Sequence, residues 1–406
     1  MRVLVVNAGS STLKLSVLDE EDTVLAHREL AAPQARADSE ELRAALAGTL
    51  GAADAVGHRI VHGGERYREA VRVDGEVRAA LEELVDLAPL HQPKSLAALD
   101  AVSAELPRLP AVACFDTAFH ATLSPAAATY ALPAPWRERW GLRRYGFHGL
   151  SHAWVARRVA ELLSAGDGPD VDSRPAGRGT PTRERPPERP GGLRIVSCHL
   201  GAGASLCAIE GGRSVDTTMG FTPLEGLVMA TRSGSVDPGL LLWLLERERL
   251  SVREMAEALE HDSGLLGLAG SADMREVVER ARAQADEGGQ ASGAASPRAA
   301  GEERPARLAL DVYVHRLRAG IAAMAAALGG LDALAFTGGV GERSAEVRSL
   351  AAEGLAFLGV ALDDARNRAA DGDAEIGAPG AAAHTFVVGA REDREIARQV
   401  RELLGR

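Results

Sequence analysis

Lysine, cysteine and aromatic residues are scarce in this chain, and each shortage excludes a class of protein. Only Lys14 and Lys94 are lysines, and no Gly-Lys-Ser or Gly-Lys-Thr triplet occurs, which excludes a P-loop nucleotide site. The formal net charge of −11 argues against a protein that coats nucleic acid or an anionic membrane. Because aromatic residues make up only 4% of the chain, aliphatic side chains must fill the core.

The three cysteines, Cys114, Cys198 and Cys207, lie in apolar runs, and no Cys-x-x-Cys motif occurs. This pattern is typical of free thiols in a reducing cytoplasm and argues against a structural zinc. We also expect no signal peptide, since the apolar run Val3–Val6 is too short for one. The longest weakly polar stretch, Ala319–Leu331, is too short to span a bilayer.

Two strand–turn–strand patterns, one in each half of the chain, predict a duplicated α/β architecture. In the first, the apolar run 3–6 precedes the small polar turn Asn7–Thr12, and an alternating run follows at 13–18. In the second, the strand Leu193–Leu200 precedes the turn Gly201–Ser205, and the strand Leu206–Ile209 follows it. A length of 406 residues corresponds to about two or three domains.

Periodicity and short apolar runs place the remaining elements. We expect helices at Ser39–Leu50, Glu76–Leu87, Ser151–Leu163, Leu308–Leu328 and Asp393–Leu404, and strands within Ala55–Gly64, Pro110–Phe115 and Ala333–Phe336. The low-complexity segments Ser164–Gly192 and Ala283–Ala306 are interpreted as disordered surface insertions, with a mobile active-site lid as the alternative for the first.

Three loops of small residues follow apolar strands: Asn7–Thr12, Gly201–Ser205 and Thr337–Glu342. Glycine lets the backbone approach a phosphate closely, and exposed N–H groups can bind its oxygens. Any one of these loops could be an ordinary turn. Their order, two hairpins and a later loop, resembles the phosphate and nucleoside loops of the actin and sugar-kinase superfamily.

Charged residues and one histidine stand at strand ends or in glycine-rich loops. Arg59 and Arg232 could each clamp a carboxylate or a phosphate, or form an ordinary surface ion pair. Asp116 could hold Mg²⁺ or orient a nucleophile, or cap the following helix. His148 lies in an aromatic, glycine-rich loop and is a catalytic candidate, whereas His58 has the pattern of a structural histidine, as does His152.

Several of these motifs resemble those of the acetate kinases, the acetokinase family. The resemblance covers the whole chain outside the two low-complexity segments. The matching stretches are Asn7–Lys14, Gly57–Glu65, Phe115–His120, Tyr145–His152, Met219–Pro238 and Phe336–Glu342.

The resemblance implies two actin-like (ribonuclease H-like) α/β domains with mixed sheets flanked by helices, and an active site in the cleft between the domains. The first would comprise residues 1–118 with 394–406, and the second residues 119–393. The family implies reversible transfer of a phosphoryl group from ATP to acetate with Mg²⁺ or Mn²⁺, in a cytoplasmic homodimer that binds neither nucleic acid nor membrane.

The matching positions imply roles for individual residues. Asn7 and Glu392 would lie near the metal and the phosphates. Arg59 and Arg232 would bind the carboxylate and stabilise the transferring phosphoryl group, with Asp116 ordering them and His148 donating a hydrogen bond. The methyl pocket would comprise Val61, Leu90, Phe147 and Pro223. The nucleotide and its phosphates would contact Ser10, Thr12, Lys14, His91, His199, Leu200, Gly201, Ala202, Gly203, Gly339, Val340, Gly341, Glu342 and Arg343.

The chain departs from the family pattern mainly on the expected nucleotide side. Ala202 and Arg343 each stand where the family usually has Asn, and Gln92 lies in an altered His-Asn-Pro segment. Ser235 replaces a common Asp, and Gly389 a common Pro. Two alternatives therefore stay open: a kinase for propionate or butyrate, and a degenerate nucleotide-binding regulatory homologue.

Overall fold

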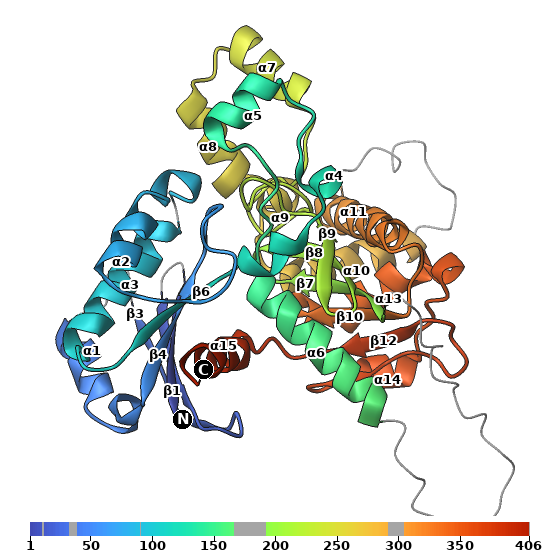
Figure 1. The fold of residues 1–406 in the computed structure, drawn as a ribbon. Coiled ribbons are helices and arrows are strands. Elements are labelled where there is room, and N and C mark those ends of the chain that lie inside the picture. Colours follow the sequence, from blue (N-terminus) through green and yellow to red (C-terminus); the bar gives the residue numbers. More distant parts are fainter. Residues whose placement is uncertain (10–11, 32–38, 90, 166–191, 291–303, 406) are drawn as a thin grey trace, which may run out of the picture. The chain divides into compact units, whose positions relative to one another are not determined.

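The computed structural model describes residues 1–9, 12–31, 39–89, 91–165, 192–290 and 304–405 (Figure 1). The chain forms two compact units: residues 1–154 with 391–406, and residues 155–390. The boundary expected after residue 118 thus falls within the first unit. Main-chain bonds such as Gly149 N–H to Asp116 O, at 2.9 Å, tie the segment after that boundary back to the strand before it.

Among the described residues, the first unit contains a sheet, six helices of its own and the start of a seventh. Its strands are β1 (Val3–Ala8), β2 (Thr12–Leu18), β3 (Val24–Ala31), β4 (Ala55–Ile60), β5 (Val71–Arg72) and β6 (Ala111–Phe115). Its helices are α1 (Ser39–Leu46), α2 (Gly75–Glu82), α3 (Gln92–Glu105), α4 (Pro125–Ala128), α5 (Ala134–Trp140), the start of α6 (Gly149–Ala165) and α15 (Glu392–Leu404), with 3-10 turns at Thr49–Ala52, Val85–Leu87 and Ala118–Thr122.

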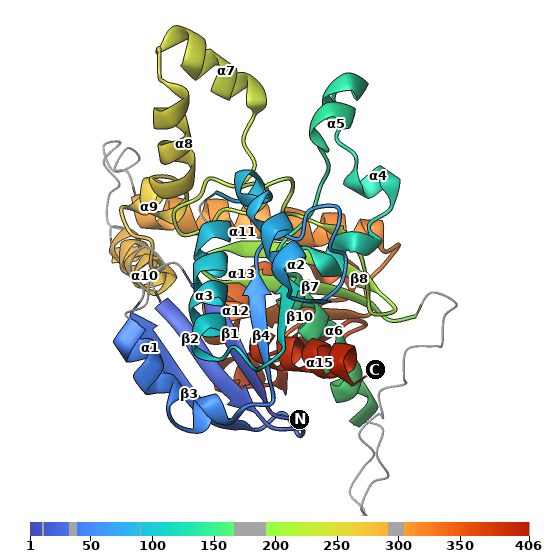
Figure 2. The ribbon, with the colours of Figure 1, turned by 60° about the vertical axis from the view of Figure 1, so that its left-hand side comes forward.

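The second unit contains the other sheet and the helices around it. Its strands are β7 (Arg194–Leu200), β8 (Ala204–Glu210), β9 (Arg213–Thr217), β10 (Ala333–Thr337), β11 (Ala374–Glu375) and β12 (His384–Val387). Its helices are α7 (Pro238–Arg247), α8 (Val252–His261), α9 (Gly264–Ala269), α10 (Met274–Gln290), α11 (Pro305–Ala327), α12 (Gly338–Arg343), α13 (Ala345–Glu353) and α14 (Asp364–Ala369), with a 3-10 turn at Ala356–Leu358. Helices α7 and α8 stand out from the sheet of this unit (Figure 2).

The two sheets have the same strand order and the same strand directions. The first runs β3-β2-β1-β4-β6-β5 and the second β9-β8-β7-β10-β12-β11. In each, the three central strands are parallel, and the others pair antiparallel. The predicted duplication, the mixed sheets and both predicted hairpins, β1–β2 and β7–β8, are therefore confirmed.

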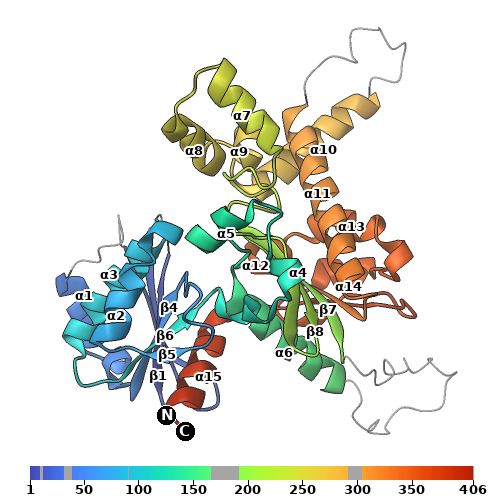
Figure 3. The same ribbon diagram turned by 45° about the horizontal axis from the view of Figure 1, so that its top comes forward.

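Helices cover both faces of the first sheet (Figure 3). On one face, α1 and α3 pack on β1, β2 and β4 through residues such as Leu42 and Val102. On the other, Ile396 and Val400 of α15 pack against Val3 and Val5 of β1. Gly57 of β4 allows this approach, because a Cβ there would lie 2.6 Å from the Ile396 side chain.

Three predicted boundaries differ from the structure. The segment Thr337–Glu342, expected to be a loop, forms the end of β10 and most of helix α12. Helix α10 continues to Gln290, and α11 begins at Pro305, so the edges of the expected insertion at 283–306 are helical. The remainder of that insertion and most of the one at 164–192 lie outside the described residues.

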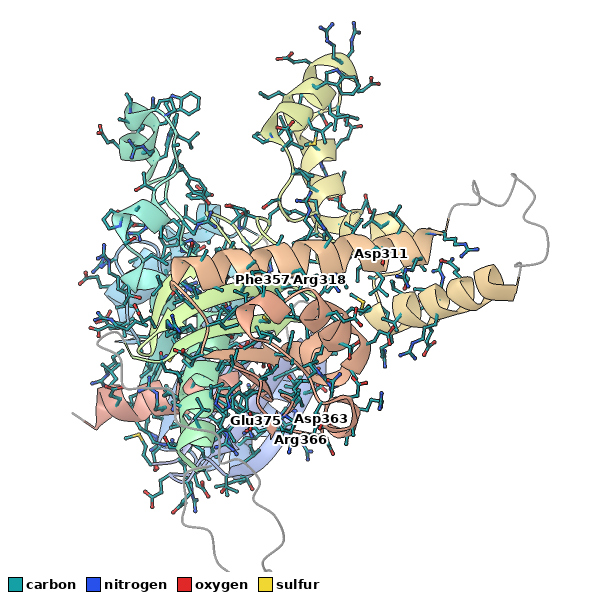
Figure 4. The ribbon with its side chains drawn as sticks, turned by 90° about the vertical axis from the view of Figure 1, so that its right-hand side faces the viewer. Asp311, Arg318, Phe357, Asp363, Arg366 and Glu375 are labelled. Atoms are coloured by element: carbon teal, nitrogen blue, oxygen red, sulfur yellow. The ribbon has the colours of Figure 1, made fainter. Side chains whose placement is uncertain are left out.

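Side-chain contacts fix the helices of the second unit to each other (Figure 4). Arg318 of α11 donates from Nε to Leu350 O of α13 at 2.8 Å. Asp363 caps α14 by accepting from the main-chain N–H groups of Ala365 and Arg366, each at 3.0 Å. Across the part of the chain that the structure describes, no helix is both long enough and apolar enough to cross a membrane.

Candidate active site

Arg59 and Asp116 form a close, largely buried ion pair at the carboxyl ends of two neighbouring strands. Nη2 of Arg59 lies 2.6 Å from Oδ2 of Asp116, and Nε lies 3.1 Å from both carboxylate oxygens. The side chain of Asp116 is 2% exposed and that of Arg59 is 19% exposed. Because β4 and β6 are parallel, with Ile60 opposite Phe115, the ends of both strands meet at one edge of the sheet.

Asn7 and Glu392 complete this charged cluster. Arg59 donates from Nη1 to Oδ1 of Asn7 at 3.2 Å, and Asn7 donates from Nδ2 to Oε2 of Glu392 at 3.3 Å. Nη1 of Arg59 also lies 3.7 Å from Oε2 of Glu392. One arginine is therefore held between two carboxylates and an amide.

The charges of the cluster depend on one another. Burial acts against the charge of Arg59, but the carboxylates of Asp116 and Glu392 raise its pKa above the usual value. Burial raises the pKa of Asp116, and Arg59 opposes that shift. Removing Arg59 would thus leave a buried carboxylate without its counter-ion, which is a costly state.

The loop that carries His148 is strained and lies against the main chain of Asp116. His148 has a φ of 56°, in the left-handed region that non-glycine residues seldom adopt. It precedes Gly149, where a Cβ would lie 2.2 Å from Asp116 O, so glycine is needed for the close approach. Strain of this kind is often kept where a side chain must point in a functional direction.

Two of the predicted pocket residues, Val61 and Phe147, are buried in the first unit. The imidazole of His62 lies beside Phe147, with ring centroids 5.6 Å apart and planes at 72°. His120 donates from Nε2 to Phe147 O at 3.0 Å, and this hydrogen bond fixes the main chain of the loop that carries His148. Leu90, also predicted for this pocket, lies outside the described residues.

Arg232 and Pro223 belong to the second unit, where the structure brings them together. Arg232 donates from Nη1 to Pro223 O at 2.6 Å. Among the described residues it forms no ion pair, and burial lowers the pKa of its guanidinium. Arg232 is thus a partly desolvated cation that, among the described residues, donates to a carbonyl and is opposed in its pKa shift only by the more distant charge of Glu260.

The described part of the first predicted phosphate loop lies at the end of β1 and the start of β2. Gly9 N–H donates to Thr12 O at 2.8 Å. Lys14 is exposed on β2, opposite Asn7 in the neighbouring strand. Ser10 lies outside the described residues. His91, predicted beside the phosphates, occupies the N-cap position of α3.

The second predicted phosphate loop joins β7 to β8. His199 and Leu200 end β7, and Gly201 N–H donates to Gly203 O at 2.9 Å across the turn. Ala202 is exposed, and its carbonyl accepts from Ala230 N–H at 3.1 Å. A methyl group therefore stands at the position that the family usually fills with an amide.

The predicted nucleoside segment is the short helix α12, which includes Gly339, Val340, Gly341, Glu342 and Arg343. Gly338 begins it with a φ of 77°, and a Cβ there would lie 2.8 Å from Leu200 O. This contact places the start of α12 against the loop after β7. Arg343 is exposed and forms no ion pair among the described residues.

Sequence analysis missed the residues that support α12. Arg348 is fully buried without a carboxylate and donates from Nη1 to the carbonyls of Gly341 and Glu342, at 2.9 and 2.7 Å. Its Nε and Nη2 donate to Asn367, each at 2.7 Å. Burial lowers the pKa of Arg348 to about 10. A single arginine in a helix that also contains exposed charges gives no sequence signal of burial.

The departures at Ser235 and Gly389 have local structural roles. Ser235 Oγ accepts from Gly226 N–H at 3.1 Å. Gly389 N–H donates to Asp373 Oδ1 at 2.8 Å.

The oxygen groups near Arg59 suit a magnesium ion. Mg²⁺ prefers hard oxygen ligands and is usually held by one or two carboxylates together with water and substrate phosphates. Asp116, Glu392 and the Asn7 amide oxygen supply that set. Across the described residues, no group of three or more His, Cys, Asp or Glu side chains could hold a metal by itself. The residues therefore fit a metal that arrives with a phosphate ligand.

Comparisons with known proteins agree on one family. A model described as the acetokinase family matches residues 39–168 and 187–398. The acetate kinase of Dictyoglomus turgidum is 40% identical, with 100% of this chain and 98% of the relative covered. The crystal structure of Porphyromonas gingivalis acetate kinase has a TM-score of 0.81 at 33% identity, and that of a Francisella tularensis propionate kinase has 0.80 at 29%, covering 99% and 98% of both chains respectively. The chain therefore belongs to the acetokinase family.

Proposed function

We propose that this protein is an acetate kinase that transfers the γ-phosphoryl group of ATP reversibly to acetate, giving ADP and acetyl phosphate. The observation that carries the proposal is the cluster in which Arg59 is held by Asp116, Glu392 and Asn7 at the ends of β1, β4 and β6. The guanidinium of this cluster can bind an anion, and its carboxylates can hold a metal ion. Both kinds of group are useful in a reaction between two anions.

The reaction needs cations more than it needs a base. A carboxylate such as acetate is already ionised at pH 7, so its oxygen can attack without losing a proton. Its approach to a triphosphate is opposed by charge repulsion, and phosphoryl transfer depends mainly on positioning and charge neutralisation. Arg59 and Arg232 supply that neutralisation, and His148 donates a hydrogen bond to the phosphoryl oxygens.

Asn7, Asp116 and Glu392 would hold Mg²⁺ or Mn²⁺. The metal would neutralise charge on the nucleotide phosphates. The chain's own contribution is to fix the orientation of these three oxygen donors through their shared contacts with Arg59. The loops at Gly201–Gly203 and α12 would bind the nucleotide with main-chain N–H groups, as small residues allow.

A propionate or butyrate kinase is the second candidate, and the likeness to the Francisella tularensis propionate kinase favours keeping it. One methylene in an apolar pocket changes binding by only about 1–3 kcal/mol, so acid preference depends on small differences around Val61 and Phe147. The degenerate regulatory homologue is disfavoured, because a binding protein would not need the intact cluster around Arg59.

A hydroxamate assay tests the proposal directly. Purified protein is incubated with Mg-ATP and acetate, propionate or butyrate, with Arg232→Ala as the control variant. We expect acyl phosphate to form best from acetate and to be lost in the variant. A preference for a longer acid would support the second candidate. ATP binding without product from any acid would contradict the kinase proposal and favour the regulatory homologue.

We further propose that the protein is a homodimer that uses the exposed side chains of α7. None of the residues of this helix is buried, and Leu240, Leu242 and Trp243 are exposed. Apolar side chains grouped on one projecting helix are typical of an association surface. Sedimentation of wild type and Leu242→Glu tests this: the wild type should be dimeric and the variant monomeric. A monomeric wild type would contradict the proposal.

We assign the reaction to the cytoplasm. Cys114, Cys198 and Cys207 are buried free thiols, which suits a reducing compartment.

A further inference from the structure

The side chain of Gln92, at the start of α3, is fully buried and binds the main chain of His62. His62 N–H donates to Oε1 of Gln92 at 3.2 Å, and Nε2 of Gln92 donates back to His62 O at 3.1 Å. Nε2 also lies 3.4 Å from Leu81 O at the end of α2. The amide of Gln92 thus pairs with both main-chain groups of one residue, His62, in the way that a neighbouring strand would.

This pairing extends the hydrogen bonding of β4 past the end of the strand. On the opposite side of the same segment, Asp116 N–H donates to Ile60 O at 3.0 Å, and Gly63 N–H donates to Thr117 Oγ1 at 3.1 Å. The segment 60–64 is therefore fixed by β6 on one side and by Gln92 on the other. It includes Val61 and directly follows Arg59, both of which act on the acid in the proposed function.

The ring of His62 connects the fixed segment 60–64 to two aromatic side chains, Tyr145 and Phe147, which together form the aromatic wall. Its Nδ1 accepts from Gly64 N–H at 2.9 Å, so Nε2 carries the proton, and Nε2 has no hydrogen-bond partner among the described residues. The ring meets Tyr145 edge to face, with centroids 4.5 Å apart and planes at 67°, and meets Phe147 in a similar way. A shift of the His62 main chain would therefore move the ring against which Tyr145 and Phe147 pack.

We propose that Gln92 is a positioning residue that determines acid selectivity: its amide fixes the peptide of His62 and, through the His62 ring, the aromatic wall beside Val61 and Phe147. The inference rests on the proposed acid-kinase function. Gln92 touches no substrate in this account, and acts only through Val61, His62 and their aromatic neighbours. Misplacement of a positioning group by a fraction of an ångström is enough to change turnover markedly.

The test compares Gln92→Met with Gln92→Glu. Methionine keeps the length and shape of the side chain but forms none of the three hydrogen bonds. Glutamate keeps an acceptor for His62 N–H but loses the donors to His62 O and Leu81 O. Gln399→Met is the matched control, because Gln399 lies in the same unit and donates to Glu395 Oε1 at 2.8 Å, away from this segment.

We expect Gln92→Met to raise the KM for acetate about tenfold and to lower the preference for acetate over butyrate about fivefold. The KM for Mg-ATP should change by less than the KM for acetate, because most of the residues expected to contact the nucleotide, those of the loop after β7 and of α12, belong to the other unit. Gln92→Glu should disturb the segment at least as much as Gln92→Met, because its buried carboxylate would face the carbonyl oxygens of His62 and Leu81, and Gln399→Met should match wild type. The proposal would be overturned if Gln92→Met changed the KM for every acid and for ATP equally, or changed none of them. Gln92 would then be a purely structural residue.

Hydrogen exchange read by mass spectrometry gives a second readout that needs no activity. The peptide covering 60–66 should exchange faster in Gln92→Met than in wild type and should be unchanged in Gln399→Met. If the exchange of this peptide is the same in Gln92→Met as in wild type, the hydrogen bonds of Gln92 do not fix the segment. If wild type forms no acyl phosphate from any acid, the proposed function fails, and with it the role in selectivity, whereas the exchange result still decides whether Gln92 fixes the segment.

Discussion

The two sheets of this protein have one topology but present different chemistry at equivalent strand ends. β4 has Arg59 as its penultimate residue and Asp116 directly follows β6, whereas the equivalent positions in the second sheet are Phe336 in β10 and Val388 after β12. Asn7 is the penultimate residue of β1, and the equivalent strand β7 is followed by the turn that contains Gly201. The first sheet therefore presents charged side chains at strand ends where the second presents apolar residues and glycine-rich segments.

This difference indicates how a duplicated fold can serve a reaction with two unlike substrates. Charged side chains suit a small carboxylate and the phosphoryl group, whose charges must be matched closely. Glycine-rich turns suit a nucleotide, whose phosphates accept from main-chain N–H groups. The two arginines proposed to act in catalysis also differ in their partners. Among the described residues, Arg59 is held by carboxylates, whereas Arg232 donates to a carbonyl.

The largest effect should come from removing either arginine. Arg59→Ala and Arg232→Ala should each lower kcat by about 10²-fold or more, because both stabilise the charge of the transferring group. Their effects on stability should differ. Arg59→Ala leaves Asp116 buried without a counter-ion and should cost about 3 kcal/mol of unfolding free energy. Arg232→Ala removes one hydrogen bond and should cost about 1 kcal/mol.

Steady-state kinetics and urea unfolding of the two variants measure this contrast. Wild-type turnover in either variant would remove that arginine from the proposed mechanism. Equal losses of stability would show that the difference in their partners has no energetic consequence.

Gly338→Ala should affect the nucleotide side selectively. The residue has a φ of 77°, and its Cβ would lie 2.8 Å from Leu200 O, so the substitution strains the start of α12 by about 1–2 kcal/mol. We expect the KM for ATP to rise about tenfold and the KM for acetate to change less than twofold. Gly372→Ala is the control for backbone strain, since Gly372 has the same φ of 77°, lies outside α12, and nothing lies within 4 Å of its Cβ. A selective rise in the acetate KM would contradict the assignment of α12 to the nucleotide.

The stability of the first unit should fall in mild acid. His58, His62 and His120 are buried there, and burial lowers the pKa of each to about 4. Unfolding restores an ordinary pKa of about 6.5, so the unfolded state takes up protons as the pH falls from about 6.5 to 4 while the folded state does not. Above pH 6.5 the histidines leave the free energy of unfolding unchanged. As the pH falls from about 6.5 to 4, each histidine lowers it by about 1.4 kcal/mol per pH unit.

His58→Leu isolates one of these contributions. The slope of unfolding free energy against pH between 6 and 4.5 should decrease by about 1.4 kcal/mol per unit in this variant. Hydrogen exchange at pH 5 should show the first unit opening before the second. An unchanged slope would mean that His58 gains a proton in the folded state.

The smallest effect is expected at Arg343. We propose that this exposed cation compensates for the missing amide at Ala202 by attracting a nucleotide phosphate. Arg343→Asn should therefore weaken ATP binding by about threefold to tenfold, as one lost polar contact implies. Calorimetric titration with ATP measures this, and tighter binding in the variant would contradict the compensation.

Local sequence patterns predicted the repeated hairpins, since strand alternation and small-residue turns act over a few residues. They predicted α12 incorrectly as a loop, because its stability depends on Arg348 and Asn367, whose burial no local pattern shows. They also missed α3, whose second residue, Pro93, looks like a helix breaker but is tolerated in the first turn.

The charged cluster could be predicted only through the family resemblance. Asn7 and Glu392 are 385 residues apart, and no local pattern joins them. The pairing arises because α15 returns to pack on β1, which depends on Gly57 and the apolar face of the helix. Gln92 was recognised as a departure, but its contacts with His62 could be found only in the structure.

Hydrogen exchange with one ligand at a time tests the division between the two sheets most directly. Acetate alone should slow exchange in the peptides covering 59–64 and 145–149, whereas ADP added without a metal ion should slow it in those covering 199–205 and 337–343. Protection of the same peptides by both ligands, or of 59–64 by metal-free ADP and 337–343 by acetate, would contradict the account.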